Sequence, residues 1–154
     1  MRYAWTAVIS LGLAASAQGK TMQCAPVSDA TVAAQFDRFN AAWATKDPDK
    51  VTALFAPDAV LLPTLSGEER KTSAGIRDYF VGFLKKSPVG HIDTSTIRTG
   101  CNKATRTGNW SVTLTDPKTH KTSVAKARYT FIYRYQSGQW MIAHLHSSLM
   151  PEGH

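Results

Sequence analysis

The chain has 154 residues, of which 43% are hydrophobic, and a formal net charge of +7. This length favours one domain with a sizeable core. Lysine and arginine are spread along the chain without a run of five or six, which argues against a nucleic-acid-binding surface and favours a solvated basic exterior. A basic pocket for a small anionic ligand is compatible with the same charge.

The first segment, residues 1–17, has the pattern of a secretory signal peptide. A short positive start precedes a mainly apolar run at 7–15, and the small residues Ala-Ser-Ala at 15–17 form a cleavage site. The run is too short to span a membrane as a helix. A retained apolar helix is the alternative. We therefore expect a secreted or periplasmic protein, not attached to the membrane after cleavage, with a tail at 18–27 and one domain at 28–152.

Export would place the two cysteines, Cys24 and Cys101, in an oxidising compartment. Two cysteines there most simply form one disulfide, which would tie the N-terminal tail to the middle of the sheet. Because the closed loop is long, the chain-entropy model gives roughly 4 kcal/mol of stabilisation. Two unpaired thiols are the alternative. Their spacing and the lack of nearby Cys or His argue against a metal site.

Helices dominate the first half of the chain. Ser28 or Asp29 caps a helix that runs to about Thr45, with apolar residues at helical spacing. The other elements expected before residue 90 are a short helix at 50–55, a strand at 58–63 that Pro63 ends, and a helix at 76–85.

Strands dominate the second half. The expected strands are 91–100, 103–115, 122–135 and 139–147. Helices followed by a long antiparallel sheet indicate an α+β fold.

The last two strands form a hairpin whose turn determines what each face carries. With Ser137 and Gly138 as the two turn residues, Phe131 lies opposite His144 and Tyr129 lies opposite His146. One face then combines aromatic side chains with both histidines, and the other carries Arg128, Thr130 and Ile132. We expect one face to meet a pocket and the other to meet a partner subunit.

Six short segments together resemble the calcium/calmodulin-dependent protein kinase II association domain and its stand-alone bacterial relatives of the SgcJ/EcaC type, within the nuclear transport factor 2-like superfamily. They are FNAAW at 39–43, DAVLLP at 58–63, GIRDYF at 75–80, HI at 91–92, ARYTFIY at 127–133, and GQW with the following HLHSS at 138–148. The likeness extends from about residue 27 to residue 152.

The resemblance implies a nuclear transport factor 2-like (cystatin-like) cone, in which N-terminal helices pack on a curved antiparallel sheet around a small-molecule pocket. It also implies self-association as a homodimer or larger ring. Where the association domain of the kinase carries Arg after its His-x-His motif, this chain has Ser147. The arginines that line the pocket of that domain are therefore not reproduced position for position. The sequence contains no Gly-rich dinucleotide loop, and we expect no cofactor.

The histidine pair is the main candidate for a site. His144 and His146 are two residues apart on a strand and so face the same way. They are candidate catalytic residues, as general base and hydrogen-bond donor in a cavity; the alternative is a structural pair bonded to the backbone or to Tyr129. A metal bound to both is disfavoured because no carboxylate lies nearby in sequence.

Four further residues are candidates for ligand binding. Tyr79 and Tyr129 offer hydroxyl groups to a pocket, while Trp43 fits core packing or a pocket wall. Arg128 is either an anchor for a carboxylate or part of an ion pair across a dimer interface.

Two classes of function are compatible with these features. The first, which we favour, is an exported, self-associating domain that binds a small and possibly anionic molecule. The second is an isomerase or cyclase of the SnoaL-like kind, with His146 or His144 as base and Tyr129 or Tyr79 as oxyanion donor.

Overall fold

The computed structural model describes residues 23–151, so the predicted signal peptide lies outside the described residues. The described chain is an α+β domain, as predicted. Its elements are α1 (Asp29–Ala44), α2 (Pro48–Thr52), β1 (Phe55–Leu62), α3 (Ser73–Phe83), the 3-10 helix η1 (Leu84–Lys86), β2 (Val89–Ile92), β3 (Thr96–Gly100), β4 (Lys103–Thr115), β5 (Thr122–Gln136) and β6 (Gln139–Leu149).

Side-chain caps explain where the helices begin. The hydroxyl of Ser28, one of the two predicted caps, accepts the N–H of Thr31 at the start of α1. Asp47 caps α2, and Pro48 fits its first turn, so this helix begins two residues before the predicted start.

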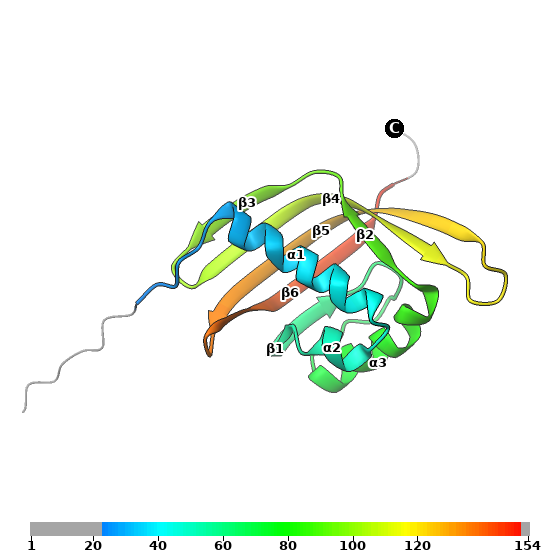
Figure 1. Cartoon of the computed structure of the whole chain (residues 1–154), viewed down its shortest axis with the longest axis horizontal. Helices are drawn as coiled ribbons and strands as arrows, with labels where there is room; N and C mark the ends of the chain where they lie inside the picture. The colour runs from blue at the N-terminus through cyan, green and yellow to red at the C-terminus, as the bar shows by residue number, and fades with distance from the viewer. Residues whose placement is uncertain (1–22, 152–154) are drawn as a thin grey trace, which may run out of the picture.

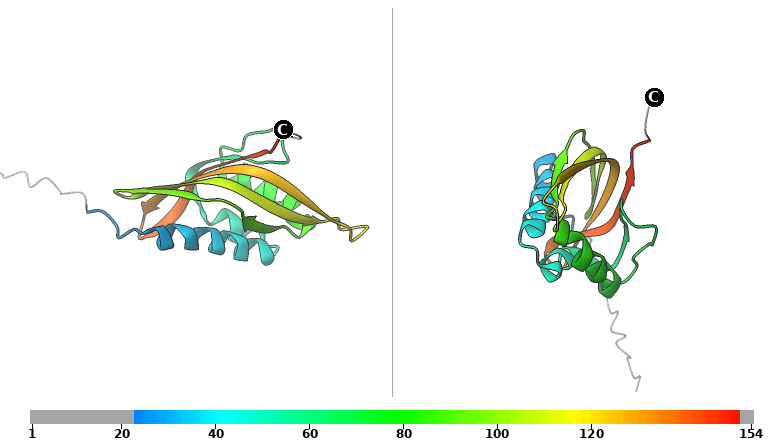
Figure 2. Two further views of the ribbon diagram at one scale, coloured as in Figure 1. Left: turned by 90° about the horizontal axis from the view of Figure 1, so that it is seen from above. Right: turned by 90° about the vertical axis from the view of Figure 1, so that its right-hand side faces the viewer.

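The sheet has the strand order β1-β6-β5-β4-β2, and β3 also pairs with β4. α1 lies along one face, which we call the inner face, and the opposite side is the outer face (Figures 1 and 2). The pairing of β1 with β6 is parallel, unlike the other pairings, and local sequence did not indicate it.

The strand predicted at 91–100 is divided into β2 and β3, which pair with successive parts of β4. Gly108 of β4 lies where the chain crosses between them. A Cβ atom at this position would lie 2.0 Å from the backbone oxygen of Thr94. Glycine therefore permits the close approach that separates the two strands.

The β5–β6 hairpin contains a bulge that reverses the predicted faces. Ser137 and Gly138 have φ angles of 51° and 83°, as a two-residue primed turn requires. Beyond the pair Tyr133–Ile142 the register slips by one residue relative to the prediction, so His144 lies opposite Ile132 and Ser147 lies opposite Tyr129. The pairings of Phe131 with His144 and of Tyr129 with His146 were therefore wrong, since a one-residue slip turns every later side chain to the other face.

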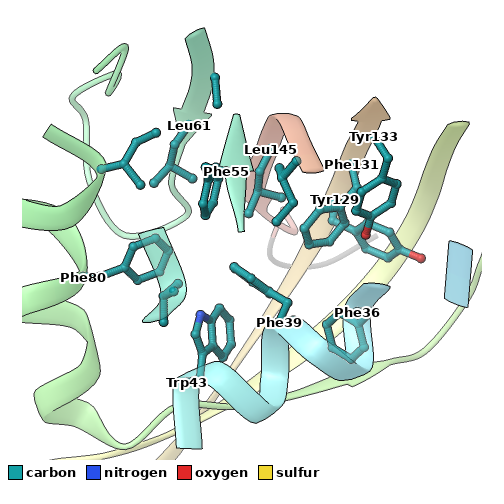
Figure 3. Packing of buried hydrophobic residues seen from close by; sticks show 14 of the residues in the cluster. Phe36, Phe39, Trp43, Phe55, Leu61, Phe80, Tyr129, Phe131, Tyr133 and Leu145 are labelled. Atoms are coloured by element: carbon teal, nitrogen blue, oxygen red, sulfur yellow. The ribbon is translucent and has the colours of Figure 1, made fainter. Parts of the chain in front are cut away.

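Aromatic side chains from α1, α3 and the inner face fill the core (Figure 3). Phe39 is fully buried, with its ring centroid 5.6 Å from that of Phe131 and 6.2 Å from that of Phe80. These edge-to-face contacts hold both helices against the sheet.

The N-terminal tail is fixed to the β3–β4 turn. The structure contains the predicted disulfide between Cys24 and Cys101. Beside it, the side-chain oxygen of Asn102 accepts the N–H of Ala25 at 2.8 Å, and its amide donates to the carbonyl of Gln23 at 3.2 Å. Covalent and hydrogen-bonded links therefore both order the start of the described chain.

Candidate functional site

A narrow apolar cavity, which we call the slot, lies between the inner face and the helices α1 and α3. Its volume is about 30 Å³, room for about two water molecules. Its lining comprises Phe39, Trp43, Leu61, Pro63, Thr64, Leu65, Tyr79, Phe80, Phe83, Trp110, Val112, Leu114, Ala125, Ala127, Leu145 and Ser147. These side chains carry no formal charge, and most are aliphatic or aromatic.

Hydroxyl groups form the polar part of the slot. Ser147 is buried and accepts the indole N–H of Trp110 at 2.9 Å, and the hydroxyl of Thr64 donates to the same oxygen. Ser147 reaches the inner face only because of the bulge in β6. Its role, like those of Thr64 and Trp110, was therefore not predicted from the sequence.

Trp43 and Tyr79, both predicted site residues, line the slot. The indole N–H of Trp43 is buried and has no hydrogen-bond partner among residues 23–151. Tyr79 stacks on Phe83 with ring centroids 5.3 Å apart. Burial raises the pKa of the Tyr79 phenol, an effect partly offset by Arg70, so the group remains a hydrogen-bond donor.

Tyr129, in contrast, does not contribute to the lining of the slot. It is buried on the inner face beside Trp110, and its hydroxyl donates to the backbone oxygen of Thr94 at 2.9 Å. This hydrogen bond anchors the loop between β2 and β3.

His144 and His146 lie on the outer face, away from the slot, and the prediction of a histidine-lined pocket is wrong. Their neighbours there are Ile132 and Thr130 on β5, with Val60 and Leu62 on β1. Burial, with a smaller contribution from the charge of His146, lowers the pKa of His144; Glu69 opposes this shift.

Arg128 also lies on the outer face, and therefore on the same side as the histidines rather than opposite them. It pairs with Ser148 of β6 and Asn109 of β4, and its side chain is exposed. The structure thus brings Arg128 and the histidine pair onto one surface and separates them from Trp43 and Tyr79.

A second, wider hollow, which we call the vestibule, adjoins the slot. Its volume is about 380 Å³, and Leu65, Tyr79 and Phe83 line both spaces. The vestibule also has charged walls, formed by Arg70, Asp78 and Lys86. None of these three residues was a predicted site residue.

One buried arginine was also missed. Arg106 of β4 is 8% exposed, and its Nε donates to the hydroxyl of Ser95 at 2.9 Å. Its guanidinium carbon lies 5.8 Å from the ring centroid of Phe36. Neutral acceptors and an aromatic ring therefore hold this cation between α1 and the sheet.

Residues 23–151 contain neither a cluster of metal-ligating side chains nor a membrane-spanning helix. Among the described residues, no group of three or more His, Cys, Asp or Glu side chains is placed to hold a metal ion. None of the helices in this range has the length and apolar character needed to cross a membrane.

Comparison with known proteins identifies both family and fold. The family model for the calcium/calmodulin dependent protein kinase II association domain matches residues 28–151. A solved Xanthomonas campestris protein assigned to this domain is 43% identical over 88% of this chain and 100% of its own, with a TM-score of 0.78.

Two more distant structures support the fold alone. A nuclear transport factor 2-like protein from Salmonella enterica is 17% identical, with a TM-score of 0.68, over 79% of this chain and 91% of its own. A ketosteroid isomerase-like protein from Erwinia carotovora is 17% identical, with a TM-score of 0.65, over 79% and 95%. No protein with a curated description matches the sequence.

Proposed function

Because the chain belongs to the calcium/calmodulin-dependent protein kinase II association domain family, we propose that it is an exported, self-associating domain that binds a small molecule in the slot. The observation that carries this proposal is the slot itself. Apolar walls with a few convergent polar groups are typical of small-ligand sites. Here the polar groups are Thr64, Ser147 and the phenol of Tyr79.

Self-association is proposed to use the outer face. None of the described helices covers this surface, and it carries the aliphatic side chains of Val60, Leu62 and Ile132 beside the histidine pair. Ile132 is 36% exposed in the single chain. Packing against a second copy would remove this apolar surface from water, and a homodimer is the simplest assembly that does so.

Export is supported by the disulfide between Cys24 and Cys101. Such bonds persist in oxidising compartments and are rare where thiols are kept reduced. The signal-peptide pattern at 1–17 points to the same compartment.

The isomerase or cyclase alternative loses the group on which it depended. It required a histidine base in the pocket, whereas His144 and His146 lie on the outer face. Tyr79 lines the slot, but its raised pKa suits a hydrogen-bond donor rather than a base. We therefore favour binding over catalysis.

Native mass spectrometry of the protein purified after export tests the proposal. We expect an assembly of at least two copies that carries a small molecule, which is released on denaturation. Ala125→Phe, which narrows the slot, should abolish retention, whereas Lys126→Gln on the neighbouring exposed residue should not. A monomer, or equal retention by both variants, would refute the corresponding part of the proposal.

A further inference from the structure

We propose that the ligand is an amphiphilic monocarboxylate, with its slender apolar part in the slot and its carboxylate in the vestibule beside Arg70 and Lys86. This inference rests on the proposed ligand-binding function of the slot. It adds the chemical class of the ligand and the orientation in which it binds.

The slot and the vestibule differ in size, and this difference determines which part of the ligand each can hold. The slot has a volume of about 30 Å³, and the vestibule about 380 Å³. They meet at Leu65, Tyr79 and Phe83, which line both. Only a thin part of a molecule, such as the end of an alkyl chain or the edge of a ring, fits the slot, so the rest of the molecule and its hydrated end belong in the vestibule.

The walls of the slot and the vestibule also differ in polarity, and this difference determines where the charged group of the ligand binds. The slot is lined by uncharged side chains, and an ionised group placed there would lose its hydration without a counter-charge. The vestibule has two cations, Arg70 and Lys86, and one carboxylate, Asp78. This balance favours a ligand with a single negative charge over a cation or a polyanion.

Arg70 is fixed in place rather than loosely held at the surface. Its backbone N–H and carbonyl both pair with Leu61 of β1, each at 2.9 Å. The side chain is 22% exposed, and its buried Nε has no hydrogen-bond partner within residues 23–151. The backbone pairing therefore fixes the position from which Arg70 lines the vestibule, where its guanidinium can donate to a carboxylate.

The acidic neighbours of Arg70 do not prevent it from binding a carboxylate. Its Nη1 lies 3.1 Å from Glu68 and 3.9 Å from Asp78, and the side chains of these residues are 75% and 77% exposed. Exposed pairs of this kind are weak, so a bound carboxylate can displace Glu68. The phenol of Tyr79, at the junction of the two spaces, supplies a further donor.

The test is a titration followed by tryptophan fluorescence, since Trp43 and Trp110 both line the slot. The probes are octanoate and octan-1-ol, and 3-phenylpropanoate and 3-phenylpropan-1-ol. In each pair the apolar part is the same and only the head group differs. We expect at least one acid to bind about tenfold more tightly than its alcohol, as one charge-assisted hydrogen bond allows. The alkyl and aryl pairs distinguish between the two apolar parts.

Three variants locate the carboxylate. Arg70→Gln and Lys86→Gln should each weaken binding of the acid while leaving the alcohol unchanged. Lys85→Gln, at an adjacent exposed lysine that does not line the vestibule, is the matched control and should bind both as the parent does. Because Lys86 is exposed, its variant provides the test even if Arg70→Gln fails to fold.

The outcomes separate this inference from the proposed function. If acids and alcohols bind equally, and both are lost in Ala125→Phe, the slot binds ligands but the carboxylate assignment is overturned. If no probe changes the fluorescence, the proposed function of the slot fails together with the inference. A preference for acids that survives in both Arg70→Gln and Lys86→Gln would also overturn the assignment.

Discussion

Ser147 links the polar groups of the slot, because its hydroxyl contacts both Trp110 and Thr64. In Ser147→Ala the buried indole N–H of Trp110 would lose its acceptor. We expect the free energy of unfolding to fall by about 1–3 kcal/mol, measured by urea denaturation. The control is Ser148→Ala on the outer face, for which we expect a change below about 0.5 kcal/mol. Equal effects would contradict a special role for Ser147.

The position of His146 reverses the effect that the sequence alone suggests for its substitution. A pocket histidine would be required for ligand retention, but His146 is exposed on the outer face. We therefore expect His146→Gln to leave the dissociation constant for a slot ligand within about twofold of the parent value, with little change in melting temperature. A large loss of binding without unfolding would show that the outer face contributes to the ligand site.

Among the elements, the helices were the most predictable from sequence because their signals are local. Ser28 caps α1, and Val32, Phe36, Phe39 and Trp43 recur at helical spacing and are buried. The turn at Ser137–Gly138 was equally local and was predicted correctly. These features depend only on residues within a few positions of one another.

The bulge in β6 was harder to predict from sequence because it depends on which face of the strand is buried. A regular strand after Ile142 would turn His144 inward and expose Leu145. The extra residue at Ala143 instead buries Leu145, which is 3% exposed, and leaves the imidazole outside. Apolar burial therefore determined the register, and the candidate pocket residues followed from that choice.

The slot could not have been assembled from local patterns, since Thr64, Tyr79 and Ser147 are distant in sequence. They meet because β1 pairs in parallel with β6 and α3 then packs back over the sheet. Trp43 and Tyr79 could be predicted as site residues because they lie on helices. Predicting Ser147 would have required the register of the whole sheet.

The disulfide joins the N-terminal tail to the β3–β4 turn, and we expect it to stabilise the fold. It closes a separation of 77 residues, for which the chain-entropy model gives roughly 4 kcal/mol of stabilisation. We expect the double variant Cys24→Ala/Cys101→Ala to lose up to about this much in urea denaturation. The denatured but unreduced parent should show no titratable thiol, and two thiols would refute the bond.

For the whole molecule, the position of His144 makes the proposed assembly sensitive to pH. Burial already lowers the pKa of His144 in the single chain, and His146 adds to this effect. Packing a second copy against the outer face would remove more water from the imidazole and disfavour its charged form further. Protons would then bind preferentially to the dissociated chain.

The sign of the pH effect follows from this preference. A histidine with a lowered pKa contributes stability that is present at neutral pH and is lost as pH falls below its ordinary value of about 6.5. We expect sedimentation equilibrium at constant ionic strength to show tight association at pH 7.5 and progressively weaker association at pH 6.5 and 5.5. A dissociation constant independent of pH would contradict the burial of His144 in the assembly.

Substitutions separate His144 from other titrating groups. His144→Gln should remove most of the pH dependence, whereas His120→Gln, at an exposed turn, should retain it. Glu69 raises the pKa of His144 and so opposes the shift. In Glu69→Gln this opposition is lost, and the imidazole should take up its proton at a lower pH than in the parent. The midpoint of dissociation should therefore move to lower pH, and a movement to higher pH would show that Glu69 acts on the assembly by another route.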